Sequence, residues 1–161
     1  MGPKGRRLQR YANLHQRTLV TKLSKKLTVC LDSNIYVSAM GFGGKPFEVV
    51  ELALKKEVLL VSSTHILDEV RKNLTRKLGL RYSEVESFLE HVVDAATLFT
   101  PTGSISVLND AKDDLVIETA LMGFADLLVT GDKAVAALKS VGDLKIETTS
   151  VFLRRFSKKP S

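Results

Sequence analysis

Two patterns of apolar residues alternate along this chain from residue 27 onward. Short β-branched or aliphatic runs are typical of buried strands, and apolar residues that recur every three or four positions are typical of helices. Strands are predicted at Leu27 to Leu31, Val58 to Ser62, a short segment leading into Pro101, Asp126 to Thr130, and Lys145 to Thr148. Helices are predicted at Asn34 to Met40, Pro46 to Lys56, Ser63 or Thr64 to Gly79, Ser83 to Ala96, Asp113 to Gly123, Ala134 to Leu138, and from Val151. Strands that alternate with helices predict an α/β fold, with a mainly parallel sheet that helices cover on both faces.

Local residue types indicate where some of these elements begin and end. The glycines between 41 and 44 and the following Pro46 predict a turn and then the start of a helix. Ser83, with Glu86 three residues later, predicts a capping box at the start of another helix. Residues 102–109 are predicted to form a polar loop.

The size and composition of the chain limit its class. With 161 residues, of which 44% are hydrophobic, the chain is long enough for one α/β domain with a short appendage. Cys30 has no partner, which excludes an intramolecular disulfide or a multi-cysteine zinc site and favours a reducing compartment. No apolar run approaches the roughly 20 residues that cross a bilayer, and the N-terminus lacks the apolar stretch of a secretory signal. We therefore expect a soluble, cytoplasmic protein without membrane contact.

The positive charge of the chain is concentrated at its N-terminus. Residues 1–26 hold eight bases and no acid, whereas residues 27–161 hold 16 bases against 18 acids. The eight bases are Lys4, Arg6, Arg7, Arg10, Arg17, Lys22, Lys25 and Lys26. Such a segment can bind the phosphate backbone of RNA by counterion release. A solvated arm and an organelle-targeting peptide are the alternatives, although the low serine content disfavours the second.

These charges also suggest a division of the chain. We predict a basic N-terminal arm at 1–26, a nuclease domain at 27–156 and a basic C-terminal tail at 157–161. Lys158 and Lys159 lie in that tail, and Arg154 and Arg155 come shortly before it.

Acidic residues at four places along the chain are the candidate chemistry. Asp32 and Asp132 follow two predicted strands closely, Glu69 lies in a predicted helix, and Asp113 and Asp114 begin another helix. Each has an ordinary explanation as a helix cap, a turn residue or a solvated side chain. In a parallel sheet, however, the carboxyl ends of the central strands surround one crevice. Acids gathered there would repel each other unless a cation were bound.

The donor atoms of these acids favour a particular kind of cation. Hard carboxylate oxygens suit Mg²⁺ or Mn²⁺, and a bound ion of this kind promotes phosphodiester hydrolysis. The three histidines do not suggest a rival site. His15 lies in the arm, His65 begins a helix, and His91 lies on a polar helix face.

Four segments of the chain resemble a known family. LDSNIYVSA, ILDEV, DAKDDLVIETAL and ADLLVTGDKAV are similar to segments of the PIN-domain family, and within it to the toxin-like PIN ribonucleases of prokaryotic toxin–antitoxin systems. The resemblance covers about residues 27–156. It implies a Rossmann-like α/β fold and a Mg²⁺- or Mn²⁺-dependent endoribonuclease acting on single-stranded RNA. It also implies a homodimer and an antitoxin protein as partner.

The resemblance also implies roles for individual residues. Asp32, Glu69, Asp113 and Asp132 are the expected catalytic residues. Asp32, Asp113 and Asp132 would hold the metal, and Glu69 would orient or deprotonate the attacking water. Asp113 is preferred to its neighbour Asp114 because Val116, Ala120 and Leu121 follow it at the expected spacing.

Some neighbouring residues are expected to have secondary roles. Asp114 is the alternative third acid, and Glu118, four positions later, would support the metal from further out. Ser33 and Thr130 would place hydroxyl groups near the site. Lys112 stands where related toxins often carry an acid, which argues against strong binding of a second metal.

Other functions on a similar fold stay open at this point. The long basic arm suits a housekeeping nuclease that processes ribosomal or other RNA. A non-catalytic RNA-binding PIN module is a further alternative, although all four acid positions are occupied. A receiver-like or phosphatase-like phosphate acceptor is weakly suggested by Lys133 directly after Asp132.

Overall fold

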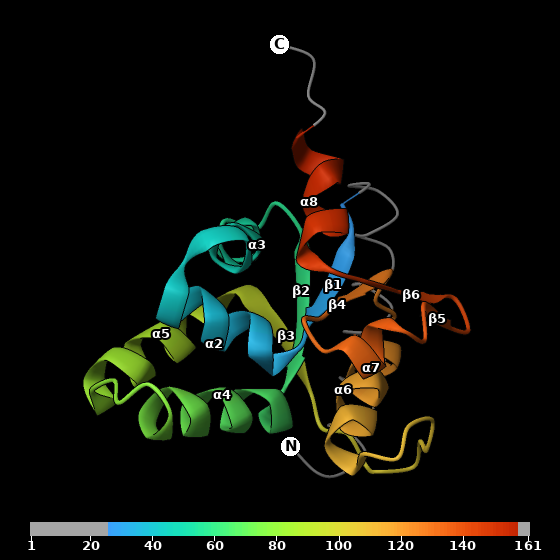
Figure 1. Cartoon of the computed structure of the whole chain (residues 1–161), viewed down its shortest axis with the longest axis horizontal. Helices are drawn as coiled ribbons and strands as arrows, with labels where there is room; N and C mark the ends of the chain where they lie inside the picture. The colour runs from blue at the N-terminus through green and yellow to red at the C-terminus, as the bar shows by residue number, and fades with distance from the viewer. Residues whose placement is uncertain (1–25, 158–161) are drawn as a thin grey trace, which may run out of the picture.

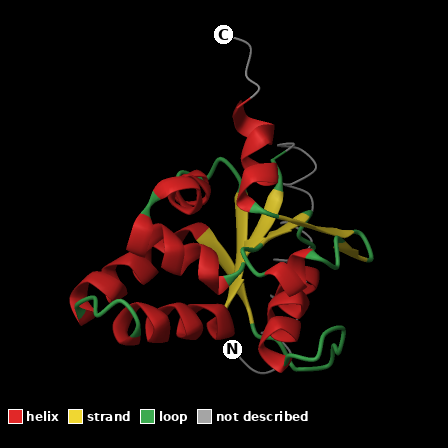
Figure 2. Cartoon of the chain, in the orientation of Figure 1, coloured by secondary structure: helices red, strands yellow, loops and turns green. Residues whose placement is uncertain are grey.

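The computed structural model describes residues 26–157, and within this part six strands form one sheet in the order β3-β2-β1-β4-β6-β5. The strands are Thr28–Leu31 (β1), Leu59–Ser63 (β2), Ala96–Phe99 (β3), Leu127–Val129 (β4), Ser140–Val141 (β5) and Leu144–Glu147 (β6). Neighbouring strands are parallel except β5 and β6, which pair in the antiparallel sense. Figure 2 shows the strands together in the middle of the domain.

Helices cover both faces of this sheet. Their bounds are Ser33–Phe42 (α2), Gly44–Leu54 (α3), Thr64–Arg76 (α4), Tyr82–Ala95 (α5), Ala111–Met122 (α6), Lys133–Ala136 (α7) and Thr149–Ser157 (α8). Figure 1 shows α2 to α5 on one side of the sheet and α6 and α7 on the other, with α8 near α3. The α/β fold with a mainly parallel, helix-covered sheet is therefore confirmed. No helix among residues 26–157 is both long and apolar enough to span a bilayer.

The order of the strands creates a switch point between β1 and β4. From β1 the chain moves outward to β2 and β3, and it then returns to place β4 on the other side of β1. Val29 of β1 lies between Leu60 of β2 and Leu127 of β4. Open α/β sheets bind ligands outside the carboxyl ends of the strands at such a point. A ligand is therefore expected beside the residues that follow β1 and β4.

The core consists of the central strands and the helix faces packed on them. Val29, Cys30 and Leu31 are fully buried in β1, and burial raises the pKa of the Cys30 thiol far above its usual range. Gly123 ends α6 at a close approach to the sheet, where an added Cβ would lie 2.4 Å from Cγ1 of Val61. The absence of a side chain at this position thus lets α6 pack tightly against β2.

The structure corrects several details of the predicted elements. The capping box at Ser83 is wrong, because α5 begins at Tyr82 and Glu86 instead contacts Arg71 of α4. Asp110, rather than Asp113 or Asp114, caps α6 by accepting hydrogen bonds from the amides of Lys112 and Asp113. The strand β5 was not predicted. Its two residues are too few for a detectable pattern of apolar positions.

Candidate functional site

Asp32 stands at the carboxyl end of β1 and is the most constrained of the four candidate acids. Its backbone amide donates to the carbonyl of Val129 at 2.9 Å, which continues the pairing of β1 with β4. Its Oδ1 accepts a 2.8 Å hydrogen bond from the amide of Ser33, so Asp32 is also the N-cap of α2. The residue is 4% exposed. Burial raises its pKa, with a smaller increase from Asp132, and its hydrogen bonds oppose this effect.

Thr130 and Asn34 connect Asp32 to the end of β4. The Thr130 hydroxyl donates to Oδ2 of Asp32 at 2.7 Å and accepts from the amide of Asp132 at 3.0 Å. The Asn34 side chain donates to Oδ2 of Asp32 at 3.3 Å and accepts from the amide of Gly131 at 3.1 Å. These two side chains fix the two loops at the switch point relative to one another.

Asp132 is held by the helix that it begins. Its Oδ1 accepts a 3.0 Å hydrogen bond from the amide of Val135, so it is the N-cap of α7. The residue is partly exposed. Asp32 and Asp132 are thus both helix caps, one of the ordinary roles considered for them, and both also lie beside the switch point.

Asp113 lies in the first turn of α6 and is close enough to the other acids to sense their charge. Burial and the negative charges of Asp110, Asp132, Asp32 and Asp114, in that order, raise its pKa to about 6. Opposite charges nearby would have lowered it instead. The negative charges of Asp32 and Asp132 thus act on Asp113, and we call these three residues the acid cluster.

Glu69, the fourth expected catalytic acid, points from α4 toward the start of α6. Its Oε1 lies 3.5 Å from the ammonium nitrogen of Lys112, the residue before Asp113. The Lys112 side chain is 64% exposed and that of Glu69 is 23% exposed. An ion pair with this exposure contributes about 0–1 kcal/mol to the free energy of unfolding. Its main effect is to place a positive charge beside the Glu69 carboxylate.

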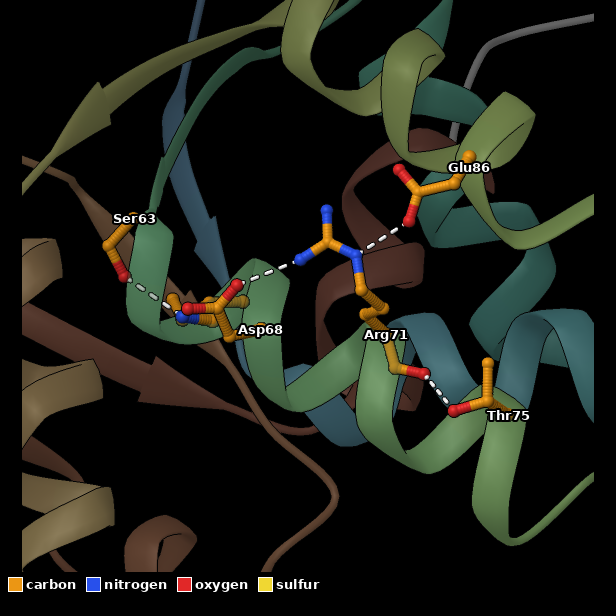
Figure 3. Close-up of polar contacts among 6 residues, drawn as sticks. Ser63, Asp68, Arg71, Thr75 and Glu86 are labelled. Atoms are coloured by element: carbon orange, nitrogen blue, oxygen red, sulfur yellow. Dashed lines mark hydrogen bonds and ion pairs between the residues drawn. The ribbon is translucent and has the colours of Figure 1, made fainter. Parts of the chain in front are cut away.

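Arg71 holds α4, the helix that carries Glu69, against α5. Figure 3 shows its guanidinium between Asp68 and Glu86, to which it donates at 2.8 Å and 2.6 Å. Ser63, one of the two residues at which the sequence places the start of this helix, caps it by accepting from the amide of Ile66 at 3.2 Å. In the same view Thr75 donates to the Arg71 carbonyl at 2.9 Å. The contact with Glu86 is the one of these that joins α4, from which Glu69 extends, to another helix.

Asp114 and Glu118 contact a loop rather than the acid cluster. Asp114 Oδ1 accepts from the amides of Val107 and Leu108 at 3.0 and 2.9 Å. Glu118 accepts four hydrogen bonds from the segment 102–104, the shortest from the amide of Thr102 at 2.6 Å. Burial would raise the pKa of Glu118, but these hydrogen bonds hold it below its ordinary value. Both carboxylates thus fasten the segment between β3 and α6.

The acid cluster suits a divalent cation that retains most of its water. Burial and, after it, repulsion by other acids raise the pKa of Asp113, and a cation would relieve the repulsion. Carboxylate oxygens are the donors that Mg²⁺ and Mn²⁺ prefer. In residues 26–157 no three His, Cys, Asp or Glu side chains lie close enough to hold one ion together. The carboxylates of the acid cluster are therefore not drawn together as direct ligands of one ion, and a cation that keeps its own water, as Mg²⁺ does, would suit them best.

Two residues of this region were missed by sequence reasoning. Asn34 was read only as part of a helix, although its amide carries both a donor and an acceptor two residues after Asp32. Among the charged neighbours of Asp113, Asp110 raises the pKa of Asp113 most. Asp110 lies three residues before Asp113, and this spacing could have indicated that it caps the helix. Ser33, whose hydroxyl was expected near the site, donates its backbone amide to the Asp32 carboxylate.

The fold and the acid cluster together define a class of protein: an α/β domain that gathers carboxylates at the switch point of a parallel sheet. Within that class, a sequence model of the PIN domain matches residues 28–134, which is more than half of the chain. The chain therefore belongs to the PIN-domain family. The resemblance of its four segments to that family and its Rossmann-like α/β fold are thus confirmed.

A solved structure gives an independent comparison. The chain is similar to one chain of the crystal structure of VapBC2 from Rickettsia felis bound to a DNA fragment from their promoter. The TM-score is 0.53, the sequence identity is 17%, and the match covers 76% of this chain and 98% of the other. At this identity the similarity concerns the fold. A sequence comparison with curated proteins finds no match.

Proposed function

We propose that this protein is a metal-dependent endoribonuclease that hydrolyses phosphodiester bonds of single-stranded RNA and serves as the toxin of a toxin–antitoxin pair. The observation that supports it best is the acid cluster, in which burial and then the charges of neighbouring carboxylates raise the pKa of Asp113 to about 6. A folded protein that retains such repulsion at a ligand-binding position is a candidate for a metal-dependent active site. Membership of the PIN-domain family supports the same function.

Asp32, Asp113 and Asp132 would hold the cation. Mg²⁺ or Mn²⁺, when bound, would offset negative charge on the phosphate and lower the pKa of water. Asp32 is suited to a fixed position because its two carboxylate oxygens accept three hydrogen bonds from the protein. Asp113 has more freedom, since it is partly exposed on the first turn of α6. A rigid and an adjustable carboxylate would together let the site bind the cation and then accommodate RNA.

Glu69 would act on the attacking water. It lies on α4, across the site from α6, and α4 is held in place by the Arg71 contacts. Its carboxylate would accept a proton from the water as the water attacks phosphorus in line with the departing 3′ oxygen. The bond between phosphorus and that oxygen would break, and the oxygen would take up a proton from solvent, leaving a 3′-hydroxyl and a 5′-phosphate. Asp114 and Glu118 would support this site by fastening the loop before α6.

RNA, an antitoxin and a second copy of the chain are the proposed partners. The arm at 1–26 would bind the RNA backbone through its eight bases, of which Lys26 alone is among the described residues. Lys26 donates to the carbonyl of Lys56 at 2.8 Å. VapBC2 is described as bound to promoter DNA, and a partnership with an antitoxin is proposed here by analogy. The cytoplasm is the proposed location.

A housekeeping RNA-processing nuclease is the second candidate, and the basic arm favours it. Both functions predict the same chemistry. An acidic antitoxin encoded beside this chain and forming a complex with it would favour the toxin. Growth arrest on expression, relieved by that partner, would separate the two candidates.

The test of the proposed function is cleavage of a labelled single-stranded RNA with Mn²⁺, with Mg²⁺ and with EDTA. Asp32→Asn should abolish cutting and retain the fold, as judged by circular dichroism. Asp143→Asn is the matched control, because Asp143 is an exposed acid in the β5–β6 turn. Cleavage that survives in EDTA or in Asp32→Asn would overturn the assignment. RNA binding without any cutting would favour a non-catalytic RNA-binding module.

A further inference from the structure

A groove lies between α3 and α8, which pack against each other (Figure 1). Leu52 of α3 and Leu153 and Phe156 of α8 are half-buried and form its apolar surface. The volume of this α3–α8 groove is about 320 Å³. The Phe156 ring lies 5.1 Å, between centroids, from the ring of the fully buried Phe152. The apolar surface of the groove is therefore anchored in the core.

Glutamates dominate the charge of the α3–α8 groove. Glu48, Glu51 and Glu57 are exposed and line it, and Lys55 is the one base among the described residues that do so. Lys55 is paired with Glu51 at 3.2 Å. None of the ion pairs within residues 26–157 includes Glu48 or Glu57. The groove thus offers two carboxylates beside an apolar surface.

The described part of the chain begins beside this groove. The ammonium of Lys26 donates to the carbonyl of Lys56 at 2.8 Å, and Glu57 is the next residue. The amide of Glu57 donates to the carbonyl of Leu52 at 3.0 Å, which holds Glu57 at the end of α3. Residues 1–25 are therefore attached to the domain at one end of the groove.

The sequence of residues 1–25 complements the groove in charge and in apolar character. It contains seven of the eight bases of the arm and no acid. Its larger apolar residues are Leu8, Tyr11, Leu14, Leu19, Val20 and Leu23. Attachment beside the groove gives this segment an effective concentration on the order of millimolar. Exposed ion pairs, which are individually weak, can then hold it together with apolar contacts.

We propose that residues 1–25 dock into the α3–α8 groove of their own domain. The inference does not depend on the proposed function, because it concerns only the domain and its arm. Glu57 precedes β2, so the groove extends to the amino ends of the strands, whereas the acid cluster follows the carboxyl ends of β1 and β4. The docked arm thus leaves the acid cluster open. An anionic ligand of the arm, such as an RNA backbone, would compete with the glutamates of the groove.

The experiment places a nitroxide on the full chain through Thr18→Cys. Cys30 is fully buried, so the added thiol is the one that reacts. A nitroxide broadens the NMR signals of amides that lie close to it. We expect broadening at Leu52 and Phe156 and none at Ile117 of α6, a helix on the other face of the sheet (Figure 1). Broadening at Ile117 alone, or at none of these residues, would overturn the inference.

A double variant distinguishes docking from mere attachment nearby. Glu48→Gln/Glu57→Gln keeps the shape of both side chains and removes their charge. It should reduce the broadening at Leu52 roughly twofold or more, and about 0.5 M NaCl should do the same by screening. Equal broadening in the wild type and in this variant would mean that the arm is only attached beside the groove, which would overturn the inference.

Glu84→Gln/Glu90→Gln is the matched control, because it removes two exposed acids from α5. It should leave the broadening at Leu52 unchanged. A loss equal to that of Glu48→Gln/Glu57→Gln would show an effect of net charge alone and would contradict docking in the groove.

A mixed sample shows whether the arm docks within its own chain. Isotope-labelled protein without nitroxide is mixed with unlabelled protein that carries it. We expect no broadening at Leu52 in this mixture. Broadening there would overturn docking within one chain and would assign the groove to the arm of a second copy.

Discussion

The hydroxyl of Thr130 donates a 2.7 Å hydrogen bond to Oδ2 of Asp32, and it accepts one from the amide of Asp132 at 3.0 Å. One fully buried side chain therefore sets the distance between two acids that follow different strands. Thr130 is itself held by its amide, which donates to the carbonyl of Glu147 in β6 at 3.0 Å. The spacing of Asp32 and Asp132 is thus determined by the sheet.

Thr130→Val tests this relationship, because it keeps the shape and removes the hydroxyl. Asp32 would lose one of three hydrogen bonds at a buried carboxylate, which should lower the free energy of unfolding by about 1–3 kcal/mol. Mn²⁺ affinity should fall as well, since the acids would lose their fixed spacing. Thermal denaturation and Mn²⁺ titration measure the two effects. Thr130→Ser should restore both, and normal behaviour of Thr130→Val would contradict a spacing role for the hydroxyl.

The raised pKa of Asp113 predicts an unusual dependence of stability on pH. An acid whose pKa is higher in the folded state than in the unfolded state binds more protons when the protein is folded. The free energy of unfolding should therefore fall, through Asp113, as pH rises from about 4 to 6. Asp113→Asn removes this cost. Without metal at pH 7.5 the variant should be more stable by on the order of 1 kcal/mol, a figure reduced for solvent screening of the partly exposed group.

Denaturant titrations of wild type and Asp113→Asn at pH 5 and pH 7.5 check this expectation. The difference in stability between the two proteins should shrink at the lower pH, where Asp113 is protonated. Asp143→Asn, at an exposed position, should show no such convergence. An equal difference at both pH values would show that neighbouring charges do not act on Asp113.

Glu118→Gln separates a role in the loop from a role at the metal. The neutral amide has one acceptor oxygen fewer, so it cannot accept all four hydrogen bonds from segment 102–104. The amides of that segment should exchange with deuterium about tenfold faster or more, corresponding to a loss of roughly 1–3 kcal/mol locally. Mn²⁺ affinity should remain within about twofold. Loss of Mn²⁺ binding with unchanged exchange would instead place Glu118 at the metal. Glu90→Gln, at an exposed position on α5, is the control.

Gly123→Ala tests the close packing of α6 on the sheet. The new Cβ would lie 2.4 Å from Cγ1 and 2.7 Å from Cγ2 of Val61, so one of the two elements must move. We expect a loss of about 1–3 kcal/mol of unfolding free energy from this overpacking. Val61→Ala in the same chain should recover part of it by removing the clash. A fully stable single variant would contradict the tight approach.

Deletion of residues 1–25 tests the basic arm. RNA binding should weaken, and the slope of log Kd against log salt should fall by about 0.7 for each RNA phosphate that the arm no longer neutralises. Cleavage of RNA at saturating concentration should persist, because the acid cluster lies elsewhere in the chain. Fluorescence anisotropy at several salt concentrations gives the slope. An unchanged slope would show that the arm does not contact RNA.

Much of the fold could be predicted because its central strands, such as β1 and β4, are buried on both faces. β1 and β4 appear as continuous apolar runs, and Asp32 and Asp132 follow them closely. The order of the sheet then brings these two acids to one switch point. Burial is a property that a linear pattern of apolar residues reflects well.

The finer contacts of the site could not be predicted, because they depend on the direction of side chains from different elements. Asp113 and Asp114 are adjacent in sequence, yet one senses the charges of the acid cluster and the other holds a loop. Successive residues of an α-helix point in different directions, so an error of one position exchanges the residue at the acid cluster for the residue at the loop. Glu86 was misread for a similar reason, since its partner Arg71 lies on another helix.

The short length of β5 affects how readily this edge of the sheet can pair with a strand of another molecule. As an edge strand of two residues, it lies between Lys139 and Gly142, which both have a positive φ, of 63° and 60°. An incoming strand needs a longer stretch of extended backbone to pair with, so this border resists the addition of further strands. We therefore expect that fibril-like growth of the sheet cannot start there, even when the protein accumulates to high concentration.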